Sequence, residues 1–164
     1  MTSRRGVIVV DRQRASEHRC PSPGALAGWV DATLRGAAIE AVDGVELTVR
    51  YVEPEESREL NAQFRGKDRP TNVLSFPASP EPGLPSTLEP GELPYLGDLV
   101  ICNAVVKSEA REQGKSVRAH HAHMVVHGIL HLLGYDHLTD EQAEAMESIE
   151  IRVMRSLGHP DPYA

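Results

Sequence analysis

The sequence predicts an α+β domain in which about four strands form one sheet, packed with about five helices. Two observations predict this class. Four β-branched or alternating apolar segments occur up to residue 102, and three segments with helix start and stop signals follow them. The length of 164 residues is typical of one domain with its own core. We therefore expect residues 1–164 to form a single domain.

The four expected strands lie in the first two thirds of the chain. Residues 6–10 are a short β-branched run, and residues 45–52 alternate between apolar and polar side chains, which indicates a half-buried strand. Two further short strands are expected over 73–76 and 99–102. The segment 78–94 between them contains five prolines and two glycines. Neither a helix nor a central strand tolerates that composition, so we expect a loop.

Helical spacing predicts two helices among the strands. One covers 24–42, and a shorter one covers 55–64, where Pro54 opens the helix at a position whose N–H needs no partner. Three more helices are expected after the last strand, each with a recognisable start or stop. They are 103–113 before Gly114, 117–133 between the cap Ser116 and Gly134, and a last one from the capping box Thr139–Gln142 to about Leu157.

Composition limits the functional classes. With 40% apolar and 25% charged residues the chain is an ordinary globular protein, and no run is long enough to span a membrane. No signal peptide is expected. The net charge of −7 argues against a general nucleic-acid coating protein but leaves room for a local basic patch. Cys20 and Cys102 are expected to be isolated thiols of a cytosolic protein, although one disulfide between them is not excluded.

Three histidines in the stretch HGILHLLGYDH predict a metal site at the C-terminal end of a long helix. His127 and His131 are four residues apart, so their rings share one side of a helix. Gly134 ends that helix and lets His137 return over the same face. Three imidazole nitrogens with an open fourth position are the ligand set of a catalytic zinc rather than of a structural one.

Other residues near this motif allow fewer conclusions. His123 is also four residues from His127, but no chain reversal supplies a third ligand there. His120 and His123 therefore either line the site, support its ligands from outside, or have no role in it. The zinc-protease motif HExxH has a glutamate after its first histidine, whereas this chain has Gly128. A peptidase of that type is therefore disfavoured.

The histidine motif, residues 127–137, resembles the HGxLHLxGYDH signature of the YbeY family of bacterial ribosomal-RNA maturation endoribonucleases. Residues 60–77 are similar to the family stretch LNxxYRxKDxPTxVLSFP, and residues 96–102 and 158–163 also resemble family segments. Two departures are visible in the second block. Phe64 stands where tyrosine is common, and Asn72 stands where many members have aspartate.

The resemblance implies a zinc-dependent, single-strand-specific endoribonuclease that acts in the cytoplasm, in 16S ribosomal-RNA 3′-end maturation and in ribosome quality control. It implies one Zn²⁺ on His127, His131 and His137, and an important arginine at Arg65. It further implies single-stranded and ribosomal RNA as substrates, contacts with ribosomal proteins and assembly GTPases, and no membrane partner.

The residues themselves are compatible with this chemistry. On the residues alone, Arg65 is more simply a solvated charge after a helix, and the family resemblance favours a functional role instead. Its guanidinium can grip a phosphate with two parallel hydrogen bonds and never loses its charge. Lys67 and Arg69 either contact the RNA backbone or are simply part of a charged loop. Asp136 either orients a ligand imidazole or only shapes the turn. A basic stripe is expected at Lys107, Arg111, Lys115 and Arg118, although Gly114 interrupts it.

Neither the nucleophile nor a general base can be assigned, because both a metal-bound water and the RNA 2′-hydroxyl could attack. Two other functions stay open on the residues alone. One is a non-catalytic ribosome-assembly factor with a structural zinc, against which the missing fourth protein ligand argues. The other is a metal hydrolase with a different substrate.

Overall fold

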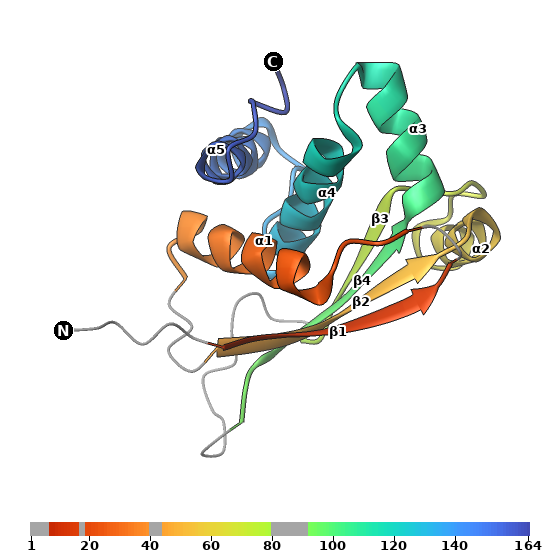
Figure 1. The fold of residues 1–164 in the computed structure, drawn as a ribbon, viewed down its shortest axis with the longest axis horizontal. Coiled ribbons are helices and arrows are strands. Elements are labelled where there is room, and N and C mark those ends of the chain that lie inside the picture. The colour runs from red at the N-terminus through yellow and green to blue at the C-terminus, as the bar shows by residue number, and fades with distance from the viewer. Residues whose placement is uncertain (1–6, 17–18, 40–43, 80–91) are drawn as a thin grey trace.

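A four-stranded sheet forms one side of the molecule, and most of the helices lie on one of its faces (Figure 1). The computed structural model describes residues 7–16, 19–39, 44–79 and 92–164. The elements in chain order are β1 (Val7–Ala15), α1 (Pro23–Gly36), β2 (Gly44–Val52), α2 (Pro54–Arg65), β3 (Val73–Pro77), β4 (Tyr95–Cys102), α3 (Asn103–Gln113), α4 (Val117–Leu132) and α5 (Asp140–Ser156). The expected α+β class is confirmed.

The strand order is β1-β2-β4-β3. β1 pairs in parallel with β2, and β2 pairs in parallel with β4, whereas β3 runs antiparallel to β4 at one edge. Parallel neighbours need a crossover connection, and α1 supplies the one between β1 and β2. The antiparallel edge strand β3 contacts α4, which carries the histidines.

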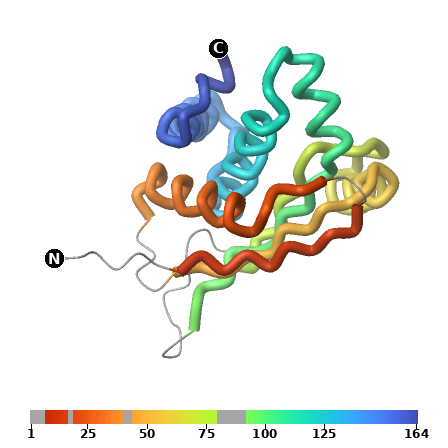
Figure 2. Tube along the Cα trace, viewed as in Figure 1, coloured from red at the N-terminus to blue at the C-terminus, as the bar shows by residue number. Residues whose placement is uncertain are grey.

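The main core lies between the sheet and the two helices α1 and α4, and α5 covers these helices on the side away from the sheet (Figure 2). The apolar positions of the alternating strand β2 point into this core, and all four are fully buried: Val45, Leu47, Val49 and Tyr51. A smaller cluster on the opposite face packs under α2 and contains Val52, Leu74, Val100 and Cys102. The sheet is therefore covered on both faces near the β3–β4 edge.

Two strand boundaries differ from the sequence expectation. The strand expected over 6–10 continues to Ala15, because the backbone of its polar half pairs with β2 although Asp11, Gln13 and Arg14 are exposed. β4 begins at Tyr95 rather than at residue 99, and Gly97 in it has φ +137°. A Cβ there would lie 2.3 Å from the carbonyl oxygen of Phe76, so only glycine fits. Gly6 and residues 80–91 of the expected loop lie outside the described residues.

The helix expected over 24–42 ends at Gly36, so this prediction was too long. Ala38 adopts φ +57°, and the amide of Ile39 donates to the carbonyl of Leu34. This is a Schellman ending with alanine in the position that glycine usually takes. Because the usual glycine is absent, the sequence carries no visible stop. Residues 40–42 of the expected helix lie outside the described residues.

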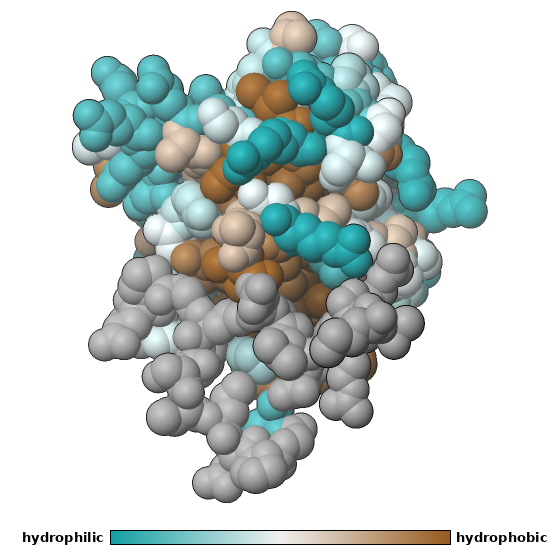
Figure 3. Space-filling model, turned by 90° about the vertical axis from the view of Figure 1, so that its left-hand side faces the viewer, coloured by the Kyte–Doolittle hydropathy of each residue, from teal (hydrophilic) through white to brown (hydrophobic). Residues whose placement is uncertain are grey.

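The surface is that of an ordinary globular protein, and the two cysteines are not joined. Figure 3 shows charged and polar residues over the upper part of one face, with apolar residues gathered in its middle. Both Cys20 and Cys102 are free thiols. Within the described residues, no helix is both long enough and apolar enough to cross a membrane.

Candidate metal centre

Two of the three histidines, His127 and His131, are positioned by α4, which is buried around nearly its whole circumference. Ser116 caps it through a hydrogen bond from the amide of Ala119 to its Oγ (3.1 Å), as expected. A helix that is apolar on all sides must be enclosed by other elements, and β3, β4, α1, α3 and α5 all contact it. The direction of its side chains is therefore fixed by packing.

The structure brings His127, His131 and His137 together. Each offers one ring nitrogen, and these three atoms all lie within 4.8 Å of one another. The Nε2 atoms of His127 and His131 are 3.1 Å apart, and the ring of His137 lies 5.9 Å and 5.3 Å from the other two ring centres. Among the described residues, no other cluster of three possible ligands was found.

The return of His137 depends on the turn after α4. The amides of Gly134 and Tyr135 donate to the carbonyls of His131 and Leu130, so the chain reverses as soon as the helix ends. Asp136 Oδ1 then accepts a hydrogen bond from the amide of His137 (2.8 Å). Of the two roles considered for Asp136, the structure shows the one that shapes the turn.

The donor set fits a transition-metal ion of the zinc type. Burial, with the neighbouring His127 and His137 rings, lowers the pKa of His131 to about 4. This imidazole is therefore neutral near pH 7, which is the form that binds a metal. Three neutral imidazole nitrogens suit zinc and related divalent metals. His137 is exposed and the other two are half-buried, so the centre opens to solvent.

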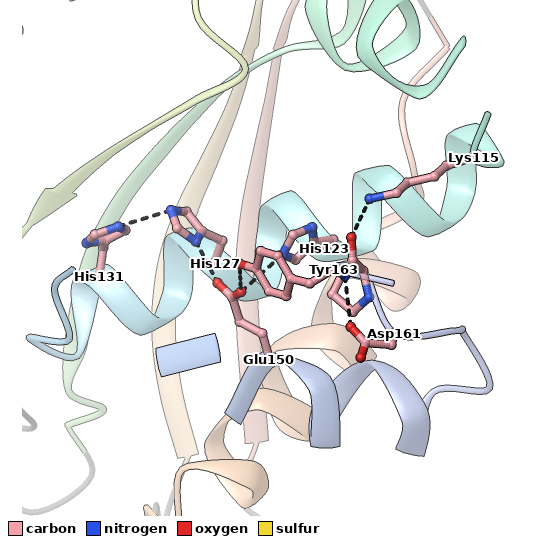
Figure 4. A network of polar contacts seen from close by, with 8 residues as sticks. Lys115, His123, His127, His131, Glu150, Asp161 and Tyr163 are labelled. Atoms are coloured by element: carbon pink, nitrogen blue, oxygen red, sulfur yellow. Dashed lines mark hydrogen bonds and ion pairs between the residues drawn. The ribbon is translucent and has the colours of Figure 1, made fainter. Parts of the chain in front are cut away.

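Glu150 on α5 is a site residue that sequence reasoning missed. Its side chain is fully buried, and its Oε1 lies 2.6 Å from Nδ1 of His127 (Figure 4). Burial alone would raise its pKa, but hydrogen bonds from His123, His127 and Tyr163 outweigh that effect and lower the pKa to about 2. The available signal was a glutamate within the apolar stripe of α5, between Met146 and Val153.

The remaining histidines of α4 each have a protein partner for Nε2, while Nδ1 of His120 and of His123 is buried without one among the described residues. His120 lies 3.0 Å from Oε1 of Glu109, and His121 lies 2.7 Å from the Tyr51 hydroxyl. His123 lies 3.2 Å from Oε2 of Glu150, so it shares a carboxylate with His127. His123 is therefore linked to the ligand His127 through Glu150, whereas His120 pairs with Glu109 instead.

A cleft of about 370 Å³ connects the three histidines with the basic loop after α2. Arg65, Lys67 and Arg69 all line it, together with the three histidines and Asp136. Among the described side chains, none forms an ion pair with these three cations. The cleft therefore combines three converging imidazoles with three cations that form no ion pair among the described residues.

The basic loop is held in place by α2 itself. Gly66 ends α2 in the left-handed conformation (φ +70°) and turns the chain into the loop. Asn61 Nδ2 donates to the carbonyl of Arg69 (2.8 Å). Ser57 Oγ donates to the carbonyl of Thr71 and accepts from its amide, at 3.0 and 2.9 Å. These buried polar residues of α2 fix the loop backbone beside the cleft.

Gly128 faces the sheet rather than the cleft. A Cβ at this position would lie 2.8 Å from Cδ2 of Leu99 and 3.3 Å from Cγ2 of Val73. The glycine therefore lets α4 pack closely on β3 and β4. A glutamate in this position would have to enter that packing, which agrees with the expectation that the site is not an HExxH peptidase site.

The side chains at the two positions that depart from the family pattern both contact other side chains. Phe64 packs edge-on against Phe76, with ring centres 5.1 Å apart, and Asn72 Nδ2 donates to Glu109 (3.0 Å). Two residues of the expected basic stripe make contacts within the protein. Lys115 Nζ donates to the carbonyl of Pro162 (2.5 Å), and the Arg118 guanidinium lies 5.7 Å from the ring centre of Trp29.

Comparison with known proteins covers the residues of this site. The family described as Endoribonuclease YbeY matches residues 13–158, which include the histidine triad, the basic loop and Glu150. The chain belongs to the YbeY family. It is therefore related to RNA-cleaving hydrolases, and the resemblance found in the sequence motifs is confirmed.

Relatives within the YbeY family are similar over nearly their whole length. The proteins named Endoribonuclease YbeY from Pseudomonas putida strains F1 and KT2440 are each 51% identical over 158 residues, covering 96% of this chain and 94% of theirs. The solution structure of TM1509 from Thermotoga maritima matches with a TM-score of 0.52 and 27% identity, over 96% of this chain and 99% of that one. The fold is therefore shared as well as the sequence.

Proposed function

We propose that this endoribonuclease depends on one Zn²⁺ held by His127, His131 and His137, and that it cuts single-stranded RNA. One observation carries the proposal: three converging imidazole nitrogens line the same cleft as three cations that form no ion pair among the described residues. A phosphodiester develops negative charge on its oxygens as it is cut, and both features would stabilise that charge. A purely structural zinc would need neither the open position nor the basic loop.

In this proposal Arg65 is the catalytic cation. It is the last residue of α2, where the left-handed Gly66 and the fixed loop direct it to the cleft. Its planar guanidinium would grip two oxygens of the scissile phosphate. Lys67 and Arg69 would hold neighbouring phosphates of the strand, so that the bond to be cut lies next to the histidines. The net charge of −7 makes this local basic loop the more important for RNA binding.

A bound zinc ion would supply Lewis-acid stabilisation and lower the pKa of its water toward about 7. The chain's own contribution is to hold the three ligand rings through the helix, the turn and Glu150. Whether water or the RNA 2′-hydroxyl attacks is decided by the product ends. A 2′,3′-cyclic phosphate would identify the 2′-hydroxyl as the nucleophile.

We further propose that the whole chain acts as one domain in the cytoplasm, in 16S ribosomal-RNA 3′-end maturation and in ribosome quality control. Ribosomal RNA would be the substrate, and ribosomal proteins and assembly GTPases would be the partners. These assignments rest on membership of the YbeY family. Single-stranded junction RNA is accordingly the substrate to test.

The test is cleavage of a short single-stranded RNA that carries the mature small-subunit 3′ junction. Wild type, Arg65→Ala and the control Arg155→Ala, which removes an exposed arginine on α5, are compared with bound metal quantified in each. We expect Arg65→Ala to keep its metal and lose cleavage, while the control keeps both. Equal cleavage by all three proteins would contradict the proposal, and a non-catalytic assembly factor would then be favoured.

A further inference from the structure

Glu150 lies between the metal centre and the C-terminal tail, and it is the centre of a four-residue group that we call the carboxylate network: Glu150, His123, His127 and Tyr163 (Figure 4). Oε1 of Glu150 lies 2.6 Å from Nδ1 of His127, and Oε2 lies 3.2 Å from Nε2 of His123. The Tyr163 hydroxyl donates to Oε2 as well. Both carboxylate oxygens are therefore engaged.

The direction of these hydrogen bonds fixes the proton on His127. An ionised carboxylate can only accept hydrogen bonds, so the Nδ1 of His127 must carry the proton. With the proton on Nδ1, the metal-binding lone pair of this imidazole is on Nε2. That atom faces His131, whose own Nε2 is 3.1 Å away. The network thus presents the metal-binding nitrogen of His127 to the centre and holds the ring in that orientation.

We infer that Glu150 is a positioning residue for the metal ligand His127, a role that rests on the proposed metal site. Metal-binding histidines commonly donate their second ring N–H to a carboxylate, which fixes the tautomer and makes the ring a better ligand. Here that carboxylate comes from a separate helix, α5, twenty-three residues away in the chain. In this role Glu150 acts through His127 and is not one of the three ligands.

Helix packing alone does not account for a carboxylate in this position. The neighbouring positions of α5 that face the core are apolar: Met146, Ile149, Val153 and Met154. Another apolar side chain would join α5 to α4 without the desolvation that a buried charge suffers. A divalent ion on the far side of His127 would favour this charge. A buried carboxylate here therefore favours metal binding by His127 more than it favours the packing of α5 on α4.

The C-terminal tail takes part through Tyr163. The tail is held by Lys115, which donates from Nζ to the carbonyl of Pro162 (2.5 Å), and by the amide of Tyr163, which donates to Asp161 Oδ1 (2.8 Å). These contacts place the phenol beside Glu150 (Figure 4). Tyr163 consequently reaches the carboxylate that contacts the ligand His127, and it lines a pocket together with His127 and His137.

The first test uses the metal-free wild-type protein and ¹⁵N NMR of its histidine rings, with the signals of His127 assigned by its loss in His127→Asn. We expect His127 to be protonated on Nδ1 at neutral pH before any metal is added. A ring protonated on Nε2 in the metal-free protein would overturn the inference. This result needs neither cleavage activity nor zinc binding, so it stands even if the proposed function fails.

The second test measures zinc affinity by competition with a chelating dye. Replacing Glu150 by Gln leaves one acceptor but also brings an N–H₂ group toward donors, so we expect about 10–100-fold weaker zinc binding and loss of the single tautomer. Tyr163→Phe keeps the carboxylate and loses one donor, so about 10-fold weaker binding is expected. The control Glu144→Gln removes an exposed carboxylate from the same helix and should leave the affinity unchanged.

A purely structural role gives a different pattern. If Glu150→Gln lowers the thermal stability of the metal-free protein but leaves zinc affinity and the His127 tautomer as in wild type, Glu150 only joins two helices and the inference is wrong. If Glu150→Gln does not fold, Tyr163→Phe decides. A zinc affinity equal to that of wild type in this variant would also overturn the inference.

Discussion

The two halves of α4 carry the same residue type in different surroundings. In the N-terminal half, His120, His121 and His123 are 3%, 3% and 6% exposed, and each has a protein partner for Nε2. In the C-terminal half, His127 and His131 line an open cleft, and their Nε2 atoms face each other. The histidine as a residue type therefore does not define the metal centre. The centre is defined by three ring nitrogens that converge beside an open cleft, whereas the Nδ1 atoms of His120 and His123, unpaired among the described residues, are buried.

The largest expected effect separates the two halves directly. His131→Ala removes one of three ligands, so we expect zinc binding and RNA cleavage to fall by more than the roughly 10–100-fold loss that follows removal of an outer partner. His120→Asn in the other half should leave both unchanged, because its partner is Glu109. Zinc content by elemental analysis checks this pair. Equal loss in both variants would remove the distinction between the halves.

The next effect concerns Arg65, which lines the same cleft as the histidines in the C-terminal half of α4. Arg65→Lys keeps the charge but loses the planar fork, so we expect cleavage to fall by about 10²–10³-fold, the range for one transition-state donor. Zinc affinity should not change, since Arg65 lines the cleft without being a ligand. Single-turnover cleavage rates with matched metal content provide the measurement. Full activity of this variant would contradict a bidentate phosphate contact.

The N-terminal half of α4 should make the stability of the protein depend on pH, without involving a metal. Burial, aided by His120, lowers the pKa of His121 to about 4, against about 6.5 in an unfolded chain. Between these values the unfolded state binds a proton that the folded state does not, so stability falls as the pH falls through this window. The loss attributable to His121 would be about 3 kcal/mol.

The variant His121→Gln keeps an acceptor for the Tyr51 hydroxyl and should lose this pH dependence. Urea unfolding of wild type and variant is compared at pH 7 and pH 4, with the metal removed. We expect the stability difference between the two proteins to change with pH. His131 contributes equally to both curves and cancels. Parallel curves would show that His121 is not held neutral by its surroundings.

The smallest expected effect tests the packing that positions both halves. Gly128→Ala places a methyl group 2.8 Å from Leu99, so we expect a loss of about 1–3 kcal/mol in unfolding free energy. Gly28→Ala on α1 meets nothing within 4 Å and should instead stabilise by about 0.5–1 kcal/mol. Thermal unfolding of both variants checks the contrast. Stabilisation by both would mean that α4 has room to spare against the sheet.

Local signals predicted much of this molecule. The caps Ser116 and Thr139 are where their side-chain pattern places them, and the i,i+4 spacing followed by Gly134 correctly grouped His127, His131 and His137. These features depend on residues close in the chain. The same holds for α3, whose start and end at Asn103 and Gln113 agree with the expectation.

Long-range features were not predictable in the same way. The polar half of β1 is a strand only because β2 lies beside it, and α1 ends at an Ala38 conformation that sequence patterns assign to glycine. Glu150 appeared as one more charge on a helix, because its partners are on α4 and in the tail. The roles of His120 and His123 differ for the same reason, since Glu109 and Glu150 come from different helices.

The most direct test of the central claim is RNA cleavage by one preparation in three states: as purified, after removal of metal by a chelator, and after return of Zn²⁺. The account predicts that cleavage disappears with the metal and returns in proportion to added zinc, up to one ion per chain. It also predicts no such recovery for His131→Ala. Undiminished cleavage by the metal-free protein would contradict it.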